Sequence, residues 1–298
     1  MRTVVTGASG FIGSALVNGL RAAGHDVVRL VRRPARLADE ISWDPTSGRV
    51  EVGALAGVEA AVNLAGAGVG DRRWTAEYKR TILSSRVEST GTLVKTLAQL
   101  DPPPRVLVSA SASGYYGDRG DEPLTEGSAP GDGFLSEVVQ AWEAAAEAAT
   151  SSGVRVVLAR TGLVLSPEGG ALGRLLPIAR LGLGGPLGSG RQWWPWITLA
   201  DEVSALMFLL EHIDLAGPVN LSAPQPARNL EVTRALGHAL RRPTIVPAPA
   251  FALRLVLGEF AGEVLSSQRM LPMRLLEAGF AFRHQTATQA AAWVTRPR

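Results

Sequence analysis

The chain of 298 residues contains no cysteine. This absence excludes disulfide bonds, thiolate nucleophiles and zinc or iron–sulfur sites that are built on cysteine. The histidines are His25, His212, His238 and His284, and no two of them have the spacing of ligands on one helical turn. We therefore predict no metal site.

An excess of charge and long apolar runs are also lacking. The 30 basic and 27 acidic residues give a net charge of +3, which is too small and too evenly spread to predict nucleic-acid binding. No stretch approaches the roughly 20 apolar residues of a membrane span. The N-terminus has no basic region before a long apolar run, as a signal peptide would. We expect a cytoplasmic protein without nucleic-acid or membrane partners.

What is present is an alternation of strand and helix patterns. Strands are predicted over 3–7, 26–31, 60–66, 105–111 and 154–165, and helices over 11–24, 74–100 and 134–153. This rhythm indicates parallel βαβ units. From about residue 166 the chain is rich in Gly, Pro and Trp, which indicates a separate lobe. The predicted fold is α/β, a Rossmann-type doubly wound parallel sheet with a smaller C-terminal substrate lobe.

A glycine-rich stretch, "GASGFIG", joins the first predicted strand to the first helix. Gly7 suits a tight turn, Gly10 allows close approach of a pyrophosphate, and Gly13 allows close helix–strand packing. The helix N-terminus then offers free N–H groups to phosphate. We predict a dinucleotide site lined by Gly7, Ser9, Gly10, Phe11, Ile12 and Gly13. The alternative is a glycine-rich turn without a ligand.

The second predicted strand ends in "RLVRRP" and carries no acidic residue at its end. NAD-selective sites place an acid there to bind the ribose 2′-hydroxyl. Asp26 lies at the start of the strand instead, and Arg32 and Arg33 stand at its end. Guanidinium groups suit a 2′-phosphate, so we predict NADP(H) as the cofactor. The alternative is that both arginines are solvated in a loop.

Further candidate cofactor contacts lie at the end of the predicted strand 60–66, in the stretch "NLAG". Leu64, Ala65 and Gly66 are small or apolar enough to let a ligand lie over the strand end. Arg86, in the helix that follows, can reach back to the cofactor phosphates. A surface salt bridge is the alternative for this arginine.

Several motifs together resemble a known superfamily. With "TGASGFIG", "NLAG", "SASASGYYG" and "RTGLVL", the chain resembles extended, epimerase/dehydratase-like short-chain dehydrogenases/reductases. The stretches "RLGLGGPLGSGRQWWPWI" and "RRPTIVPAPAFALRLVLGE" resemble the nucleoside-diphosphate-sugar epimerase-like subfamily, which ends in a short C-terminal domain of unknown function. The resemblance implies NADP(H) binding by a Rossmann domain over 1–165, to which about 194–222 returns. It also implies a substrate lobe and C-terminal helical domain over 166–298.

The resemblance further implies catalysis by a serine, a tyrosine and a lysine four residues after that tyrosine. Ser111 matches the serine best, with Ser109 and Ser113 as alternatives in register. The tyrosine and lysine positions hold Phe134 and Val138, and no Tyr-x-x-x-Lys occurs in the sequence. The usual proton-transfer pair is therefore replaced.

Two substitutes for that pair can be named from the sequence. Tyr115 or Tyr116, just after the strand end, can supply a phenol, and we take Tyr116 as the candidate together with Ser111. Glu137 can act as an acid if its surroundings raise its pKa. The alternatives are that the tyrosines are packing residues and that Glu137 faces solvent.

The stretch "GSGRQWWPWI" supplies the candidate substrate contacts. Arg191 and Gln192 can bind a phosphate or another polar group. Trp193, Trp194 and Trp196, with Tyr115, can stack on a ring or close the pocket. Burial at the interface between the lobes is the alternative for the tryptophans. The sequence thus predicts an NADP(H)-dependent oxidoreductase or epimerase for a small-molecule substrate. The alternative function is a redox-responsive regulator that binds the cofactor without turnover.

Overall fold

The structure is a computed structural model that describes residues 1–170, 172–173 and 175–296. In this part of the chain, one large sheet has the strand order β12-β8-β6-β5-β1-β2-β3-β4. Its strands are β1 (Arg2–Thr6), β2 (Asp26–Val31), β3 (Glu40–Asp44), β4 (Arg49–Val50), β5 (Ala60–Asn63), β6 (Val106–Ala112), β8 (Arg155–Thr161) and β12 (Gly217–Leu221). All neighbours pair in parallel except β3 and β4. The predicted α/β, Rossmann-type fold is confirmed.

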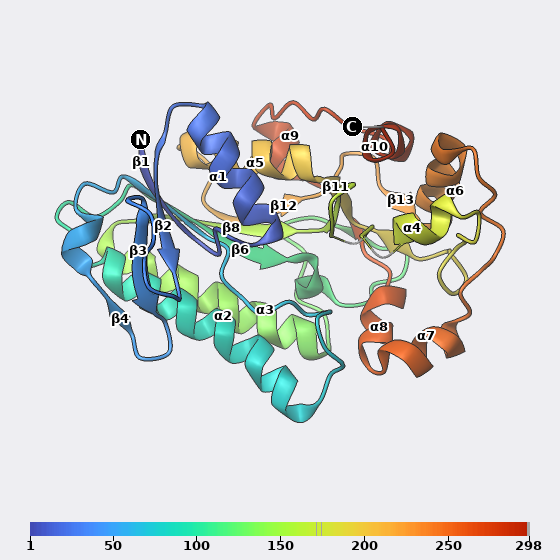
Figure 1. The fold of residues 1–298 in the computed structure, drawn as a ribbon, viewed down its shortest axis with the longest axis horizontal. Coiled ribbons are helices and arrows are strands. Elements are labelled where there is room, and N and C mark those ends of the chain that lie inside the picture. Colours follow the sequence, from blue (N-terminus) through green and yellow to red (C-terminus); the bar gives the residue numbers. More distant parts are fainter. Residues whose placement is uncertain (171, 174, 297–298) are drawn as a thin grey trace.

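Helices cover both faces of this sheet (Figure 1). One face carries α1 (Phe11–Ala22) packed on α5 (Leu199–Glu211), and the other carries α2 (Ala76–Leu97) packed on α3 (Phe134–Glu147). The central strands β1, β5, β6 and β8 are mostly buried, as expected for strands covered on both faces. None of the described helices is long and apolar enough to span a membrane.

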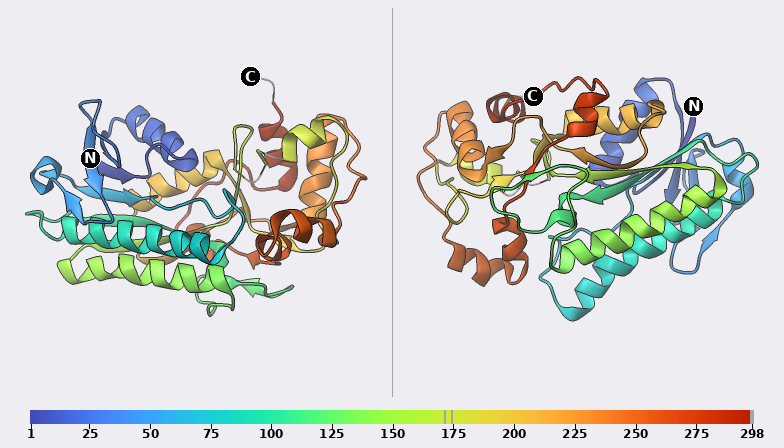
Figure 2. Two further views of the ribbon diagram at one scale, coloured as in Figure 1. Left: turned by 60° about the horizontal axis from the view of Figure 1, so that its bottom comes forward. Right: turned by 180° about the vertical axis from the view of Figure 1, so that it is seen from behind.

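The C-terminal lobe lies at one end of the sheet (Figures 1 and 2). Its helices are α4 (Leu175–Arg180), α6 (Asn229–Leu240), α7 (Ala250–Leu257), α8 (Phe260–Leu265) and α10 (Ala287–Val294). Helix α9 (Met273–Glu277) instead packs on β12 of the main sheet. Short strands join the lobes: β7 (Pro123–Leu124), β9 (Leu163–Leu165), β10 (Trp193–Trp194), β11 (Trp196–Thr198), β13 (Ala227–Arg228) and β14 (Arg269–Met270). Short 3₁₀ helices complete the fold: η1 (Val52–Leu55), η2 (Ser113–Tyr116) and η3 (Ala148–Ser152).

The structure corrects the element boundaries in two places. The predicted strand 154–165 is split at Gly162, where a Cβ would lie 1.7 Å from the carbonyl oxygen of Pro195. Strand β9 then leaves the main sheet and pairs with β11. Strands β3 and β4, which extend the sheet beyond β2, were missed because neither forms a long apolar run.

The sheet order fixes where a ligand can bind. The chain passes from β1 to β2 on one side of β1 and later to β5 on its other side. The strand order therefore reverses between β1 and β5. The connections that leave these two strands run in opposite directions, and a crevice for a ligand is expected outside their carboxyl ends. The glycine-rich stretch after Thr6 and the segment after Asn63 both lie at this edge.

Candidate active site

The glycine loop is shaped by close backbone contacts. Gly7 has a φ of +64°, and a Cβ on it would lie 2.5 Å from the carbonyl oxygen of Leu64. A Cβ on Gly13 would lie 2.2 Å from the carbonyl oxygen of Gly7. Helix α1 begins after Gly10 without any side-chain cap. Its first N–H groups have no intrahelical acceptor and are therefore available to an anion.

Hydrogen bonds hold the two strand ends at a fixed distance. The Thr6 hydroxyl donates to Asn63 Oδ1 at 2.7 Å and accepts from the backbone N–H groups of Leu64 and Ala65. The Asn63 amide donates to the Thr90 hydroxyl at 2.8 Å. The predicted contacts Leu64 and Ala65 are thus brought beside the glycine loop. Thr6 and Asn63 were not predicted from the sequence, because their pairing depends on the order of the strands in the sheet.

Arg86 is a half-buried cation beside this crevice. A Cβ on Gly66 would lie 3.1 Å from Arg86 Cγ, so the glycine leaves room for the arginine. The guanidinium donates to the carbonyl oxygens of Ala67 and Ile82 and stacks over Trp142. Burial lowers the pKa of Arg86 to about 10, and no ion pair to a carboxylate is formed in the described part of the chain. A partly desolvated charge without a carboxylate partner is unfavourable, so this position favours an anionic ligand.

The two arginines after β2 have different surroundings. Arg33 binds Glu40 through two hydrogen bonds of 2.8 and 2.7 Å, and the bonds from Arg33 lower the pKa of Glu40 to about 2. Arg32 is exposed and has no hydrogen bond or ion pair among the described residues. Because Leu30 pairs with Thr6, Arg32 follows a strand end that lies beside the glycine loop. Arg32 is therefore the free cation of the predicted pair.

Ser111 does not present its hydroxyl to a crevice. It is buried, and its Oγ donates to Glu143 Oε1 at 2.5 Å. Ser109 is also buried and bonded to Asn63. Ser113, at the start of η2, is half-buried, and the described contacts include no hydrogen bond from its hydroxyl. Among the three serines, the structure therefore leaves Ser113 available to a ligand.

The adjacent tyrosines also differ in accessibility. Tyr116 is completely buried, and its hydroxyl lies 2.6 Å from Asn220 Oδ1 and 3.1 Å from Arg160 Nη1. Burial raises the pKa of Tyr116. Tyr115 is half-buried, and the guanidinium of Arg160 lies 3.4 Å from its ring centroid. The structure gives Tyr116 a packing position and leaves the Tyr115 ring partly accessible.

The start of α3 offers no replacement proton donor. Phe134 packs edge-on against Trp74 with ring centroids 5.0 Å apart, and Val138 is buried. A shift of register by one residue gives Leu135 and Val139, which cannot transfer a proton either. Glu137 is exposed on its helix.

The tryptophan-rich stretch is mainly packing. Trp194 and Trp196 are buried in the apolar core of the C-terminal lobe, and Gln192 is buried with its amide bonded to the carbonyl oxygen of Leu187. The two tryptophans are thus buried, as the alternative interpretation has it, but in the core of the C-terminal lobe and not at the interface between the lobes. Arg191 is exposed.

Trp193 is more accessible than the two other tryptophans of this stretch. The guanidinium groups of Arg228 and Arg269 lie 4.5 and 5.0 Å from the centroid of its ring. Its indole N–H donates to Asp121 at 2.6 Å. Only the three-dimensional fold brings these residues together, because they come from four separate segments of the chain.

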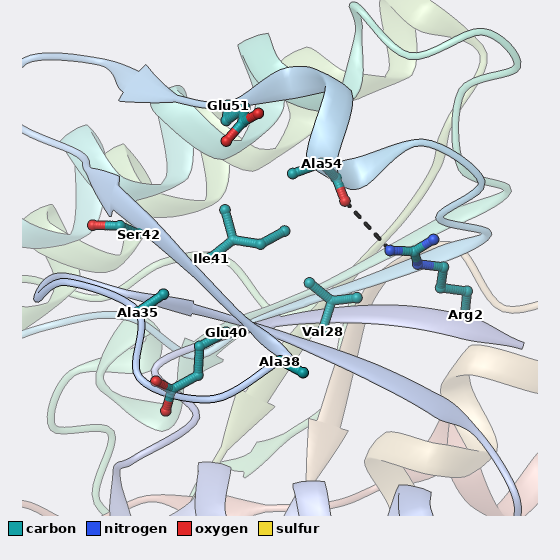
Figure 3. Close-up of a pocket in the computed structure, with 9 residues that line it drawn as sticks. All are labelled: Arg2, Val28, Ala35, Ala38, Glu40, Ile41, Ser42, Glu51 and Ala54. Carbon is teal, nitrogen blue, oxygen red and sulfur yellow. Dashed lines mark hydrogen bonds between the residues drawn. The ribbon is translucent and has the colours of Figure 1, made fainter.

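A polar cavity of about 400 Å³ lies away from the crevice (Figure 3). It is lined by residues of β2, β3 and the loop between them, with Arg2 and Ala54 joined by a hydrogen bond at one side. Arg2 begins β1, whereas Gly7 follows its end. None of the predicted site residues lines this cavity. No cluster of three metal-ligating side chains is found in the residues that the structure covers.

Glu202, in the first turn of α5, is a buried acid near the carboxyl end of β8. Its Oε1 accepts a hydrogen bond of 2.8 Å from Thr161, and its Oε2 has no partner among the described atoms. Burial raises the pKa of Glu202 to about 8, although the Thr161 bond acts in the opposite direction. The side chain is therefore mainly protonated at neutral pH.

Glu202→Gln is expected to be more stable than the wild type above neutral pH. Between the ordinary pKa of 4.5 and the folded value of about 8, the folded state keeps a proton that the unfolded chain has released. The free energy of unfolding therefore falls as pH rises through this window, by several kcal/mol at most. Urea unfolding from about pH 5 to about pH 9 should show this decline in the wild type and a weaker one in the variant. Glu211→Gln, exposed on the same helix, should keep the wild-type slope; equal slopes for all three proteins would contradict the prediction.

Comparison with known proteins places this arrangement in a family. Residues 3–222 match the model of the NAD dependent epimerase/dehydratase family, and residues 248–294 match a domain of unknown function, DUF1731. The chain is 46% identical over 292 residues to the Epimerase family protein Mb2239 of Mycobacterium bovis, covering 98% of this chain and 96% of that protein. The structure of human epimerase family protein SDR39U1 with NADPH matches with a TM-score of 0.91 and 36% identity, covering 99% of both chains.

A second solved structure extends the comparison. The nucleoside-diphosphate sugar epimerase from Corynebacterium glutamicum matches with a TM-score of 0.82 and 32% identity, over 99% of this chain and 58% of that chain. The matched regions include the glycine loop and the C-terminal helices described above. The chain therefore belongs to the NAD dependent epimerase/dehydratase family of extended short-chain dehydrogenases/reductases, with a C-terminal DUF1731 domain.

Proposed function

We propose that the protein binds NADP(H) in the crevice between the ends of β1 and β5. Two observations carry this proposal. The glycine loop leaves no room for a Cβ at Gly7 or Gly13, and the half-buried guanidinium of Arg86 beside it has no carboxylate partner among the described residues. The first turn of α1 and Arg86 would hold the pyrophosphate. Residues 1–165, with 194–222, would form the cofactor domain, and 166–298 the substrate lobe.

Arg32 would select NADP(H) over NAD(H). It is free among the described contacts, whereas Arg33 is bound to Glu40. The related human protein was crystallised with NADPH. A guanidinium beside the ribose favours a 2′-phosphate through charge-assisted hydrogen bonds.

Arg32→Ala is expected to raise the Kd for NADPH by about 10- to 100-fold and to leave the Kd for NADH unchanged. The reason is that only NADPH carries the 2′-phosphate. Fluorescence titration with both nucleotides measures this. Arg36→Ala removes an exposed arginine of the same loop and should change neither constant. A parallel loss of affinity for both nucleotides in Arg32→Ala would contradict the assignment.

We further propose that the protein is an NADP(H)-dependent oxidoreductase or epimerase-like enzyme for a small carbonyl or sugar-nucleotide-like substrate. When bound, the cofactor supplies a hydride or accepts one. Ser113 and Tyr115 are the accessible hydroxyl groups at the end of β6, and they take the place of the less accessible Ser111 and Tyr116 as candidate substrate contacts. Arg191 and Trp193 are the accessible groups of the second lobe.

The absence of a tyrosine–lysine pair at Phe134 and Val138 supports one other function, a redox-responsive regulator without turnover. The two functions are distinguished by following NADPH absorbance at about 340 nm against carbonyl compounds and nucleotide sugars. Oxidation by any member of the panel supports the enzyme. Tightly bound NADPH that no compound oxidises, with no epimerisation of any nucleotide sugar, supports the regulator.

A further inference from the structure

Lysine is rare in this protein. The sequence contains two, Lys79 and Lys95, among 30 basic residues. Both lie on α2, but Lys95 is exposed near its C-terminal end, whereas Lys79 lies in its first turns. Arginine cannot be deprotonated in proteins, whereas lysine can transfer a proton. The surroundings of Lys79 therefore bear on the missing proton donor.

The Lys79 ammonium lies over the residue that replaces the tyrosine. Its Nζ is 4.6 Å from the centroid of the Phe134 ring and 5.9 Å from that of Trp74. Phe134 begins α3, whose N-terminus lies beyond the carboxyl end of β6, on the same edge of the sheet as the glycine loop. The amine is therefore within reach of the place where a tyrosine at position 134 would present its hydroxyl.

The C-terminal domain holds this amine in place. Glu259, just before α8, accepts from Lys79 Nζ at 2.7 Å. The next residue, Phe260, packs on Trp74 with ring centroids 5.5 Å apart. The Lys79 side chain is 29% exposed and that of Glu259 is 56% exposed. An ammonium has three donors, so one bond to Glu259 leaves N–H groups for a ligand.

We propose that Lys79 is the proton donor and acceptor of the active site. It takes over the role of the family's tyrosine, whose position is held by Phe134. This inference rests on the proposed function. An ammonium and a phenol are comparably weak acids in water, so the exchange preserves the proton chemistry. Glu259 and the ring of Phe134 are positioning groups, which attract the cation and fix its direction.

The proton balance of the step is complete. During reduction of a carbonyl compound, an N–H bond of the Lys79 ammonium breaks and an O–H bond forms on the substrate oxygen as the carbonyl carbon gains hydride. The products are an alcohol, the oxidised cofactor and a neutral amine, which regains its proton from water. In the reverse direction the neutral amine takes the hydroxyl proton.

Chemical labelling tests the position of Lys79 without a substrate. The intact protein is treated with trinitrobenzenesulfonate, and the peptides with Lys79 and Lys95 are quantified by mass spectrometry. If Lys79 is the proton donor, a bound cofactor lies beside its amine and shields it, so saturating NADPH is expected to lower the labelling rate of Lys79 at least about fivefold. Lys95 serves as the internal control and should label equally in both conditions. Unchanged labelling of Lys79 with NADPH bound would overturn the proposal.

Lys79→Arg tests the chemical role. It keeps a cation over Phe134 and a partner for Glu259, but cannot release a proton. We expect unchanged thermal stability and NADPH affinity, with reduction of an active carbonyl compound slower by at least about 100-fold. Lys95→Arg should retain the wild-type rate. A rate for Lys79→Arg within about threefold of the wild type would refute the role. If the wild type oxidises no NADPH at all, the proposed function fails, whereas the labelling result still decides where Lys79 lies.

Discussion

Gly13→Ala is expected to raise the Kd for NADPH by at least about 100-fold, equivalent to about 2.7 kcal/mol. The added Cβ would lie 2.2 Å from the Gly7 carbonyl oxygen, 2.9 Å from its carbonyl carbon and 3.0 Å from Ala8 Cα. All three atoms belong to the backbone, so no side chain can move aside. Relief requires the loop to separate from α1, which displaces the N–H groups that would hold the pyrophosphate. We also expect a loss of stability of about 1–3 kcal/mol.

A second glycine in a helix provides the control for this experiment. A Cβ on Gly91, within α2, would meet no atom within 4 Å beyond its chain neighbours and the backbone of its own helix. Gly91→Ala should therefore stabilise the protein by about 0.5–1 kcal/mol without affecting NADPH binding. Fluorescence titration and thermal unfolding of the three proteins measure both quantities. An unchanged Kd in Gly13→Ala would show that the cofactor does not use this loop.

The glycine loop could be predicted because its information is local. Three glycines, a strand before them and a helix after them all lie within the first 22 residues, and the structure has each of them in place. The parallel fold followed in the same way from apolar runs of suitable length. Strand β3 was missed because only Ile41 and Trp43 of its five residues are apolar, so it forms no apolar run.

Side-chain accessibility could not be predicted from local sequence. Ser111 matches the family's serine and Tyr116 was the candidate substitute for its tyrosine. The hydrogen-bond partners of Tyr116 and Ser111 in the core, Asn220 and Glu143, are 104 and 32 residues away. Whether a hydroxyl faces a ligand or a buried partner depends on these distant groups. The same holds for Lys79, whose partner Glu259 is 180 residues away. The composition shows that lysine is rare, but only the fold shows that Lys79 contacts Phe134 and Glu259.

Removal of the Glu143 carboxylate is the second change for which we expect a large effect. Arg160 and Glu143 form a buried ion pair with bonds of 2.8 and 2.9 Å, and both side chains are less than a tenth exposed. Burial alone would lower the pKa of Arg160, but its bonds to Glu143 and Tyr116 raise it above the ordinary value. Glu143→Ala leaves this charge buried without a partner and should cost about 3–5 kcal/mol in the free energy of unfolding.

A double variant separates the unpaired charge from the loss of packing. Glu143→Leu combined with Arg160→Met removes both charges, so most of the stability lost in Glu143→Ala should return. Recovery should be incomplete by about 1–2 kcal/mol, because the hydroxyl of Ser111 loses its acceptor. Urea unfolding measures all variants, with the exposed pair Arg105–Glu59 as control, where Arg105→Ala should cost less than about 1 kcal/mol. If Glu143→Ala costs no more than this surface change, the pair does not anchor β8 to α3.

If the cost is as large as expected, the same pair also fixes Tyr115, over whose ring the Arg160 guanidinium lies. Loss of the pair should then disturb the accessible hydroxyl groups beside the cofactor crevice as well as the core beneath them.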